Sequence, residues 1–229
     1  MDAERGGGRR RGVVALGANL GDRVATLRAA VRDLDAVDGV SVVAGSRPVE
    51  SVALTLDGPD ASRPGYVNAV VLVETTLDAA ALLEALHAVE AQHGRVRTER
   101  WGDRTLDLDL VDLEGVRVDG DTGGHDAGTH DAGTHDAGTD EVGLDEAGGD
   151  EAGAGGTAGA ASRLRLPHPR AAERDFVLAP WLEVDPAARL TGQGTVADLL
   201  AALPTGSGPL RPMPGEAPLA APADPRGAP

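Results

Sequence analysis

The chain has 229 residues, with 21 Lys+Arg against 37 Asp+Glu and a formal net charge of −16. It contains no Cys and no Lys, which excludes disulfides, thiolate metal sites, Schiff-base chemistry and the Lys-dependent phosphate loop of many nucleotide-binding proteins. The negative charge argues against nucleic acid or an anionic membrane as a partner, and no apolar run is long enough for a transmembrane helix. We therefore expect a cytoplasmic protein.

Composition separates a folded part from three segments that we expect to be disordered. Residues 119–162 hold 11 of the 37 acidic residues, no Arg and a repeated HDAGT, and so little apolar surface cannot offset the entropy of ordering. Residues 204–229 hold eight of the 15 Pro and no apolar period, and residues 1–11 also lack one. The expectation is one domain over 12–203, interrupted by the insertion 119–162.

Hydrophobic periodicity and capping residues predict a regular order of elements in the folded part. In chain order we expect a strand at 13–17, a helix at 22–34, strands at 40–45 and 66–75, a helix at 77–92, strands at 106–113, 116–118 and 164–166, and helices at 169–175 and 196–203. Asp22 and Asp78 are the expected N-caps of the first two helices. The order β-α-β-β-α-β predicts an α+β fold, a ferredoxin-like sandwich with an antiparallel sheet and helices on its faces.

Two carboxylates occur two residues apart in the expected strand LDLDL. Because side chains alternate along a strand, Asp107 and Asp109 share one face. Neighbouring carboxylates repel each other unless a cation lies between them, and Mg²⁺ is commonly bound by one or two carboxylates together with phosphate oxygens. The alternative is an amphipathic strand with a solvated acidic face.

A basic loop precedes this strand and favours the metal interpretation. Arg95, Arg97, Arg100 and Arg104 lie within ten residues, between a helix end and the two Asp. Guanidinium groups opposite a metal are suited to binding a polyphosphate. Taken alone, the loop could be an ordinary charged surface loop, but the two features together favour a metal–polyphosphate site.

The few aromatic residues and one His are further candidates. Tyr66, Trp101 and Phe176 lie beside the expected site segments, where flat rings suit a flat ligand, whereas Trp181 is better explained as core. His168, held between two Pro and close to several Arg, could donate to a phosphate or could be structural. The His of the HDAGT repeat have no rigid spacing and are expected to belong to a solvated linker.

Four segments together resemble a known family. GANLGDR, GYVNAVV, VEAQHGRVRTERWGDRTLDLDL and RLRLPHPRAAERDFVLAPWLEVDP are similar to 6-hydroxymethyl-7,8-dihydropterin pyrophosphokinase of folate biosynthesis. The resemblance covers about 12–118 and 163–190. It implies a ferredoxin-like α+β fold, ATP as co-substrate, two Mg²⁺ ions, and transfer of pyrophosphate from ATP to the hydroxymethyl oxygen of the pterin with release of AMP.

The resemblance also implies roles for individual residues. The expected metal ligands are Asp107 and Asp109; the expected catalytic residues are these two with Arg95, Arg97 and Arg104; the expected ATP contacts are Glu90, Arg97, Arg100, Trp101, Arg104, Leu110, Arg163, His168 and Arg174; and the expected pterin contacts are Ser51, Tyr66, Asn68, Trp101 and Phe176. The sequence departs from the family at VESVA, where Ser51 stands for a Thr and the Pro are absent, in a longer stretch at 53–65, and in the insertion before LPHP.

Two other functions are compatible with the residues. One is a different Mg²⁺-dependent phosphotransferase on the same scaffold, acting on another flat alcohol. The other is a non-catalytic metal-binding or partner-binding protein whose acidic repeat is the functional part. If the chain is a pterin pyrophosphokinase, we expect only small-molecule partners, namely ATP and a hydroxymethyl dihydropterin. We also expect a monomer that binds neither nucleic acid nor membrane.

Overall fold

The computed structural model describes residues 8–55, 58–60, 65–94, 105–119, 164–204 and 210–222. All of them belong to one of the two units into which the chain divides, Met1–Gly120 together with Leu164–Pro229. The second unit, Asp121–Arg163, lies outside the described residues, and so does the predicted insertion apart from its first residue. No helix in the described ranges is long and apolar enough to cross a membrane.

The centre of the fold is an antiparallel sheet with the strand order β12-β3-β6-β1-β7, in which β2 also pairs with β6. The bounds are β1 Arg10–Ala18, β2 Val40–Gly45, β3 Val49–Ser51, β6 Tyr66–Thr75, β7 Asp107–Leu113 and β12 Arg211–Pro212. Strands β2 and β3 pair with successive halves of the long β6, while β1 lies between β6 and β7. This is the strand arrangement that the ferredoxin-like prediction requires.

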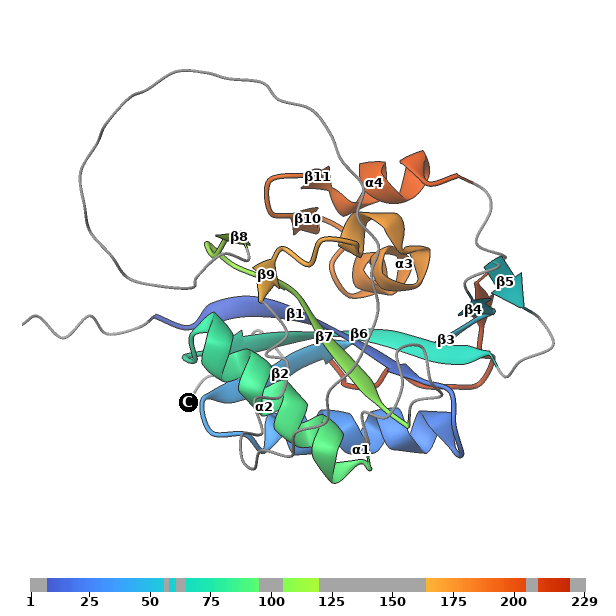
Figure 1. Cartoon of the computed structure of the whole chain (residues 1–229), viewed down its shortest axis with the longest axis horizontal. Helices are drawn as coiled ribbons and strands as arrows, with labels where there is room; N and C mark the ends of the chain where they lie inside the picture. The colour runs from blue at the N-terminus through green and yellow to red at the C-terminus, as the bar shows by residue number, and fades with distance from the viewer. Residues whose placement is uncertain are drawn as a thin grey trace, which may run out of the picture. The chain divides into compact units, whose positions relative to one another are not determined.

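Two amphipathic helices cover one face of the sheet, α1 Arg23–Asp35 and α2 Ala79–Gln92 (Figure 1). Each begins at the predicted cap, because the Asp22 and Asp78 carboxylates accept the backbone N–H groups of Ala25 and Ala81. Their apolar residues and one face of the strands form the first core, which includes Val14, Leu16, Val67, Ala69, Leu82, Leu86, Leu108 and Leu110. The predicted periodicity of both helices is confirmed.

The opposite face is covered by α3 Asp175–Val184 and α4 Val196–Ala202 (Figure 1). They pack on a second core of Val13, Val70, Val111, Val177, Leu178, Trp181, Leu190 and Val196. Trp181 is buried in this core, as the sequence indicated. Helix α3 is absent from the predicted elements because Pro180 lies in its interior, where proline normally interrupts a helix.

Short elements complete the described fold. They are β4 Ala53–Thr55 with β5 Gly58–Asp60, β8 Val118–Asp119 with β9 Arg165–Leu166, β10 Arg189–Leu190 with β11 Gly194–Thr195, and the 3₁₀ turn η1 Ala171–Glu173. The turn η1 replaces most of the helix that was predicted at 169–175. Strands β8 and β9 pair with each other, so backbone hydrogen bonds join residues 118–119 to residues 165–166.

Two predicted limits of the folded part are wrong. Strand β1 begins at Arg10, inside the segment predicted to be disordered, and pairs with Thr75. Residues 210–222, in the predicted disordered tail, also pack on the domain: β12 pairs with β3, and Leu219 and Ala220 contact the first core. The tail lacks periodicity because it is held by two paired residues and isolated apolar contacts, which leave no repeat in the sequence.

Candidate active site

The two predicted metal ligands lie on β7, at one end of the sheet order. Asp107 pairs across the sheet with Gly17 of β1, which in turn pairs with Asn68 of β6. Directly paired residues of an antiparallel sheet point to the same face. Asp109 is two residues from Asp107 and shares its face, which is the face covered by α3. The strand alternation predicted from LDLDL is therefore confirmed.

Arg174, the residue before α3, connects this strand to the aromatic side of the site. Its Nη1 donates to Oδ2 of Asp109 at 3.1 Å, and its guanidinium carbon lies 5.7 Å from the ring centroid of Phe176. The side chains of Arg174 and Asp109 are 24% and 35% exposed, so the ion pair is partly shielded from solvent. One cation thus contacts both a predicted metal ligand and a predicted pterin contact.

His168 lies between η1 and β7, and the backbone fixes its tautomer. The backbone N–H of His168 donates to the carbonyl of Val111 at 2.8 Å. The ring Nδ1 accepts a hydrogen bond from the backbone N–H of Arg170 at 3.2 Å. With Nδ1 accepting, a neutral ring carries its proton on Nε2. Burial lowers the pKa of His168 below 6.5, opposed by Asp109 and reinforced by Arg174. Near neutral pH the ring is therefore an uncharged donor through Nε2.

Glu90 is the most deeply buried charged residue of the site. It lies near the end of α2, is 1% exposed, and its Oε1 accepts the backbone N–H of Leu108 at 2.7 Å. Leu108 lies between the two Asp on β7, so this bond secures the outer edge of the strand that carries them. Further along the same edge, the His168 N–H holds the Val111 carbonyl. A direct contact with ATP, as the resemblance implied, stays a prediction.

The predicted pterin contacts on the sheet lie beside the acidic pair. Ser51 of β3 is paired with Tyr66 of β6, and its Oγ accepts a hydrogen bond from Nδ2 of Asn68 at 2.8 Å. Asn68 is buried, while Ser51 and Tyr66 are partly exposed. Alternation along β6 places Tyr66 and Asn68 on the same face as Val70, which packs in the α3 core.

Gly17 completes the row between Asn68 and Asp107, and sequence reasoning did not place it in the site. A Cβ at this position would lie 3.3 Å from Oδ1 of Asn68, so the missing side chain leaves space between the amide and the carboxylate. Gly17 opens the GANLGDR segment, which the sequence analysis used only for the family resemblance. Recognising Gly17 required its register against β6 and β7.

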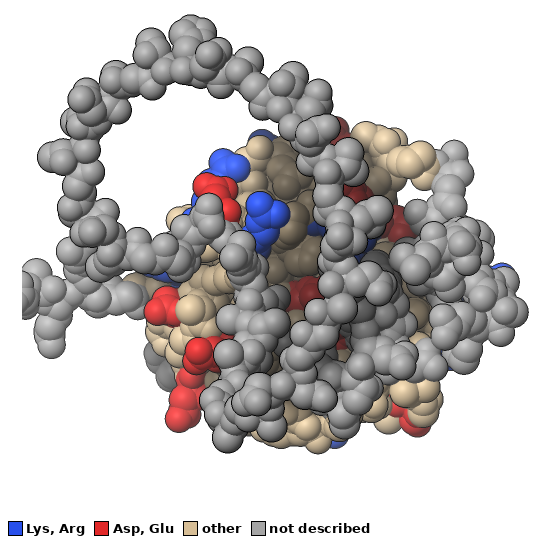
Figure 2. Space-filling model, viewed as in Figure 1, with Lys and Arg blue, Asp and Glu red and all other residues tan. Residues whose placement is uncertain are grey.

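Several predicted site residues lie outside the described residues, namely Arg95, Arg97, Arg100, Trp101, Arg104 and Arg163. Leu110 is described, but its side chain is buried in the first core, on the face opposite to the acidic pair. Any contact of Leu110 with ATP therefore falls to its backbone. On the face drawn in Figure 2, acidic and basic side chains of the described residues are interspersed.

The donor set fits a hard divalent cation that is also bound by its substrate. Asp107 and Asp109 offer oxygen ligands from one face, and Arg174 already places a positive charge against one of them. Within the described ranges no group of three or more His, Cys, Asp or Glu could hold a metal by itself. Such a pair of carboxylates suits Mg²⁺, because this ion keeps coordination positions for water and phosphate oxygens.

The fold is that of a ferredoxin-like α+β protein, and the carboxylate, guanidinium and imidazole groups of the candidate site are those expected of a phosphotransferase. A family model described as 7,8-dihydro-6-hydroxymethylpterin-pyrophosphokinase (HPPK) matches residues 13–186. The chain belongs to this family.

Individual relatives agree with this assignment. The 2-amino-4-hydroxy-6-hydroxymethyldihydropteridine pyrophosphokinase of Methylorubrum extorquens is 33% identical over 193 residues, which are 84% of this chain and 93% of the relative. The protein of the same name from Mycobacterium leprae is 36% identical over 190 residues, 80% of this chain and 75% of the relative. The one from Pseudomonas putida is 46% identical over 101 residues, 44% of this chain and 80% of the relative.

A solved structure shares the fold. The Plasmodium falciparum HPPK-DHPS, crystallised with pteroate, matches with a TM-score of 0.52 and 10% sequence identity. The match covers 87% of this chain but 44% of that chain, so the present chain corresponds to less than half of the Plasmodium protein. At this identity the likeness concerns the fold alone, and it agrees with the ferredoxin-like prediction.

Proposed function

We propose that this protein transfers pyrophosphate from ATP to the hydroxymethyl group of 6-hydroxymethyl-7,8-dihydropterin, a step of folate biosynthesis. The observation that carries the proposal is the row formed by Asp107, Gly17 and Asn68 across three strands. On one face of the sheet this row holds a carboxylate that we propose to bind metal and an amide suited to a pterin edge. Membership of the HPPK family supports the same reaction.

Asp107 and Asp109 are the proposed holders of two Mg²⁺ ions, with phosphate oxygens as the remaining ligands. Bound there, the metal supplies charge neutralisation of the triphosphate and a lower pKa for the pterin hydroxyl. The protein's own contribution is to hold two carboxylates on a rigid strand whose outer edge is secured by Glu90 and by the backbone of His168. Because the carboxylates are already held in place, the site does not have to reorganise during the reaction.

His168 and Arg174, which follow the start of the LPHP segment, are the proposed phosphate ligands. Arg174 donates to Asp109, and we propose that it would bind a phosphate oxygen of the substrate if a metal occupied that carboxylate. His168 presents Nε2–H as a neutral donor. Arg97 and Arg104, outside the described residues, are proposed to stabilise charge in the transition state, and Arg95, Arg100 and Arg163 to support binding of the triphosphate.

The pterin is proposed to lie between Tyr66 and Phe176, with Asn68 and Ser51 at its edge. Tyr66 and Phe176 come from opposite walls, since one lies on the sheet and the other on α3. Trp101, outside the described residues, is the proposed cover of the closed site. Ring stacking adds about 0.5–1.5 kcal/mol per pair to the burial of apolar area.

The reaction balances without any further reactant. The hydroxymethyl oxygen forms a bond to the β-phosphorus of ATP, and the bond between that phosphorus and the oxygen bridging to the α-phosphorus breaks. AMP leaves with the bridging oxygen, and the hydroxyl proton is released to solvent or to a base. We also propose that the protein works in the cytoplasm, where its co-substrate ATP is available, and that it is a monomer.

Incubation of the protein with ATP, Mg²⁺ and the hydroxymethyl dihydropterin tests the proposal. We expect AMP and a pterin diphosphate, dependent on both Mg²⁺ and the pterin. The Asp109→Asn variant should show no turnover while keeping its circular dichroism spectrum. Turnover of another flat alcohol in place of the pterin would assign the protein to a different phosphotransferase activity, and no turnover of any acceptor would contradict the proposal.

A further inference from the structure

The C-terminal strap, which we define as residues 210–222, is a part of the fold that the proposed function has not used. It lies beyond residue 186, where the family match ends. The strap runs along the open edge of β2 and β3, on the side of the sheet away from β7 (Figure 1). Its position raises the question of what it holds in place.

The strap pairs with the backbone at two places along this edge. Arg211 and Pro212 pair with Glu50 and Val49 of β3. Farther along, the Leu219 N–H donates to the carbonyl of Ser46 at 3.0 Å, and the Gly45 N–H donates to the carbonyl of Ala220 at 3.1 Å. The outer edge is thereby covered from the end of β2 to the middle of β3, which protects strands that would otherwise present unpaired backbone groups.

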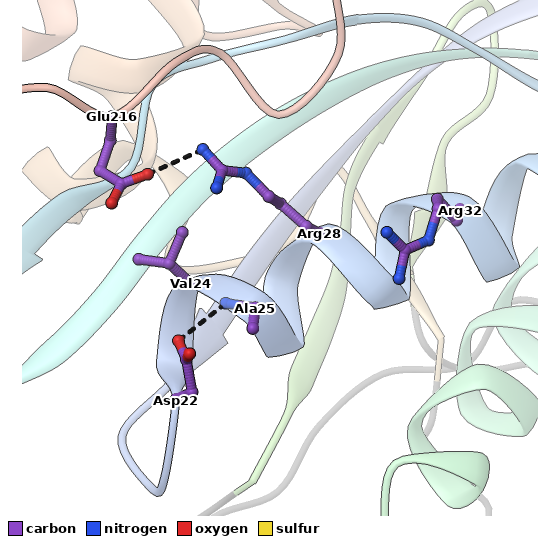
Figure 3. A pocket seen from close by; sticks show the side chains of 6 residues that line it. All are labelled: Asp22, Val24, Ala25, Arg28, Arg32 and Glu216. Carbon is purple, nitrogen blue, oxygen red and sulfur yellow. Dashed lines mark hydrogen bonds and ion pairs between the residues drawn. The ribbon is translucent and has the colours of Figure 1, made fainter.

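Side chains anchor the strap at two further places. Met213, Leu219 and Ala220 pack against the first core. Glu216 receives a hydrogen bond from Nη2 of Arg28 on α1 at 2.7 Å, at the rim of a hollow lined by Asp22, Val24, Ala25, Arg28, Arg32 and Glu216 (Figure 3). The hollow lies on the α1 side of the sheet, whereas the acidic pair faces α3. Among the described residues, the strap therefore reaches the acidic face of the sheet through β3 and the end of β2.

The approach of the strap to β2 depends on a glycine. A Cβ at Gly45 would lie 2.7 Å from the backbone nitrogen of Ala220 and 3.2 Å from Cβ of Leu219. Both are backbone or near-backbone atoms, which cannot rotate away as the end of a long side chain can. A single methyl group at Gly45 is therefore expected to push the strap off the edge while leaving every residue of the strap unchanged.

Strand β3 is the strand on which the strap acts most directly. It has three residues, too few to be stable without partners on both sides, and its last residue is Ser51. Ser51 accepts the hydrogen bond from Asn68 and pairs with Tyr66, two of the proposed pterin contacts. On the opposite face, Glu50 receives a hydrogen bond from Arg23 at 2.9 Å. The strap supplies the outer partner of this strand.

We infer that the C-terminal strap is a positioning element for the pterin side of the site: by pairing with β3 it fixes Ser51, and through Ser51 the amide of Asn68. This inference rests on the proposed function. The strap does not touch the substrate itself. Its hydrogen bonds and its ion pair go to β2, β3 and α1, whereas the proposed metal and phosphate ligands lie on β7 and before α3. Loss of the strap should therefore affect the two substrates differently.

Two truncations of the full chain test the inference. Removal of 205–229 takes away the strap, and removal of 223–229 is the matched control that keeps every strap contact named above. For the first we expect KM for the pterin to rise by about fivefold to tenfold, the loss of about one hydrogen bond, with kcat and KM for ATP near the values of the full chain. The second should match the full chain in all three constants.

A point substitution tests the same inference without shortening the chain. Gly45→Ala should reproduce the rise in pterin KM, while Gly8→Ala, where a Cβ meets nothing within 4 Å, should not. Calorimetric binding of the pterin in the presence of a non-reactive ATP analogue should show the same loss of affinity. This variant also decides the matter if the truncated chain does not fold.

The possible results distinguish failure of the proposed function from failure of the inference about the strap. If the full chain makes no pterin diphosphate, the proposed function fails and the inference falls with it. If the full chain is active but removal of the strap and Gly45→Ala leave pterin KM unchanged, the inference alone is overturned. A fall in kcat or in melting temperature with unchanged pterin KM would also overturn it, because that result describes a strap that only stabilises the fold.

Discussion

Two aspartates on β7 show how differently the same side chain works at different positions of one strand. Asp109 is partly exposed and faces Arg174, whereas Asp112 is buried and accepts hydrogen bonds from the N–H of Leu113 and from both the N–H and the hydroxyl of Thr191. The first arrangement leaves oxygen lone pairs for a metal. The second uses the carboxylate to tie the loop after β10 to the sheet.

The two positions should therefore respond in opposite ways to substitution. For Asp109→Asn we expect loss of turnover with a free energy of unfolding within about 1 kcal/mol of wild type, since a partly exposed ion pair is worth little. For Asp112→Ala we expect a loss of about 1–3 kcal/mol from the unpaired groups of Thr191, with KM for ATP preserved. Urea unfolding and steady-state kinetics measure both effects. Near-normal turnover of Asp109→Asn would remove this residue from the metal site.

If a metal binds Asp109 as proposed, Arg174 would compete with it, because the Arg174 guanidinium donates to the same carboxylate. In Arg174→Gln this competition is gone, so the affinity for Mg²⁺ without nucleotide should rise by up to about fivefold, equivalent to an ion pair of about 1 kcal/mol. Affinity for ATP with Mg²⁺ should instead fall by about tenfold or more, because a charge-assisted bond to phosphate is lost. Calorimetry gives both values, and Arg170→Gln, which removes an exposed pair with Glu173, is the control. A fall in both affinities would contradict the competition.

The stability of the folded protein should depend on pH through His168, and burial of its ring determines the sign of that dependence. Its pKa in the folded protein lies below the ordinary 6.5, so the unfolded chain takes up the proton first as the pH falls. Stability should consequently decrease from about pH 6.5 down to the folded-state pKa and then level off with respect to this group. His168→Gln should remove that decrease, as measured by unfolding at several pH values. An NMR titration of the ring with a midpoint above 6.5 would show that the neighbouring carboxylates outweigh burial.

At the scale of elements, the edge strand β7 is held from outside by a helix and a loop. The contact from α2 is the Glu90 carboxylate on the Leu108 N–H. Glu90→Gln keeps an acceptor oxygen, so we expect its free energy of unfolding to stay within about 1 kcal/mol of wild type and its Mg²⁺ affinity to be retained. Glu90→Ala leaves a buried donor unpaired and should cost about 1–3 kcal/mol and weaken Mg²⁺ binding. Equal damage in both variants would show that the charge of Glu90, rather than its hydrogen bond to β7, is what the site requires.

The elements that could be predicted are those whose signal is local. Neighbouring residues are enough to predict the caps at Asp22 and Asp78, the helical periodicity that follows them and the alternation of β7. The structure confirms all of these. Helix α3 was missed because Pro180 argues locally against a helix, while its burial in the second core stabilises it. Strand β3 and the C-terminal strap were missed because their pairing partners lie far away in the sequence. Strands β8 and β9 overlap the strands predicted at 116–118 and 164–166.

At the scale of the whole molecule, the site is assembled from segments that the fold brings together. Chemistry and the family resemblance named Asp107, Asp109, His168 and Arg174 as candidate site residues from the sequence, and their roles stay predictions. Their relations were not predictable: the Arg174–Asp109 pair, the burial of Glu90 and the place of Gly17 in the row all follow from strand register and from the packing of α3. The positions between 95 and 104 stay predictions.

Phosphorus NMR of a completed reaction distinguishes transfer of a whole pyrophosphate group from transfer of a single phosphoryl group. The sample contains the protein, Mg²⁺, ATP and one equivalent of the hydroxymethyl dihydropterin. We predict the single resonance of AMP together with two coupled resonances from a pterin diphosphate, because attack occurs at the β-phosphorus. ADP with a pterin monophosphate would show attack at the γ-phosphorus and would contradict the account.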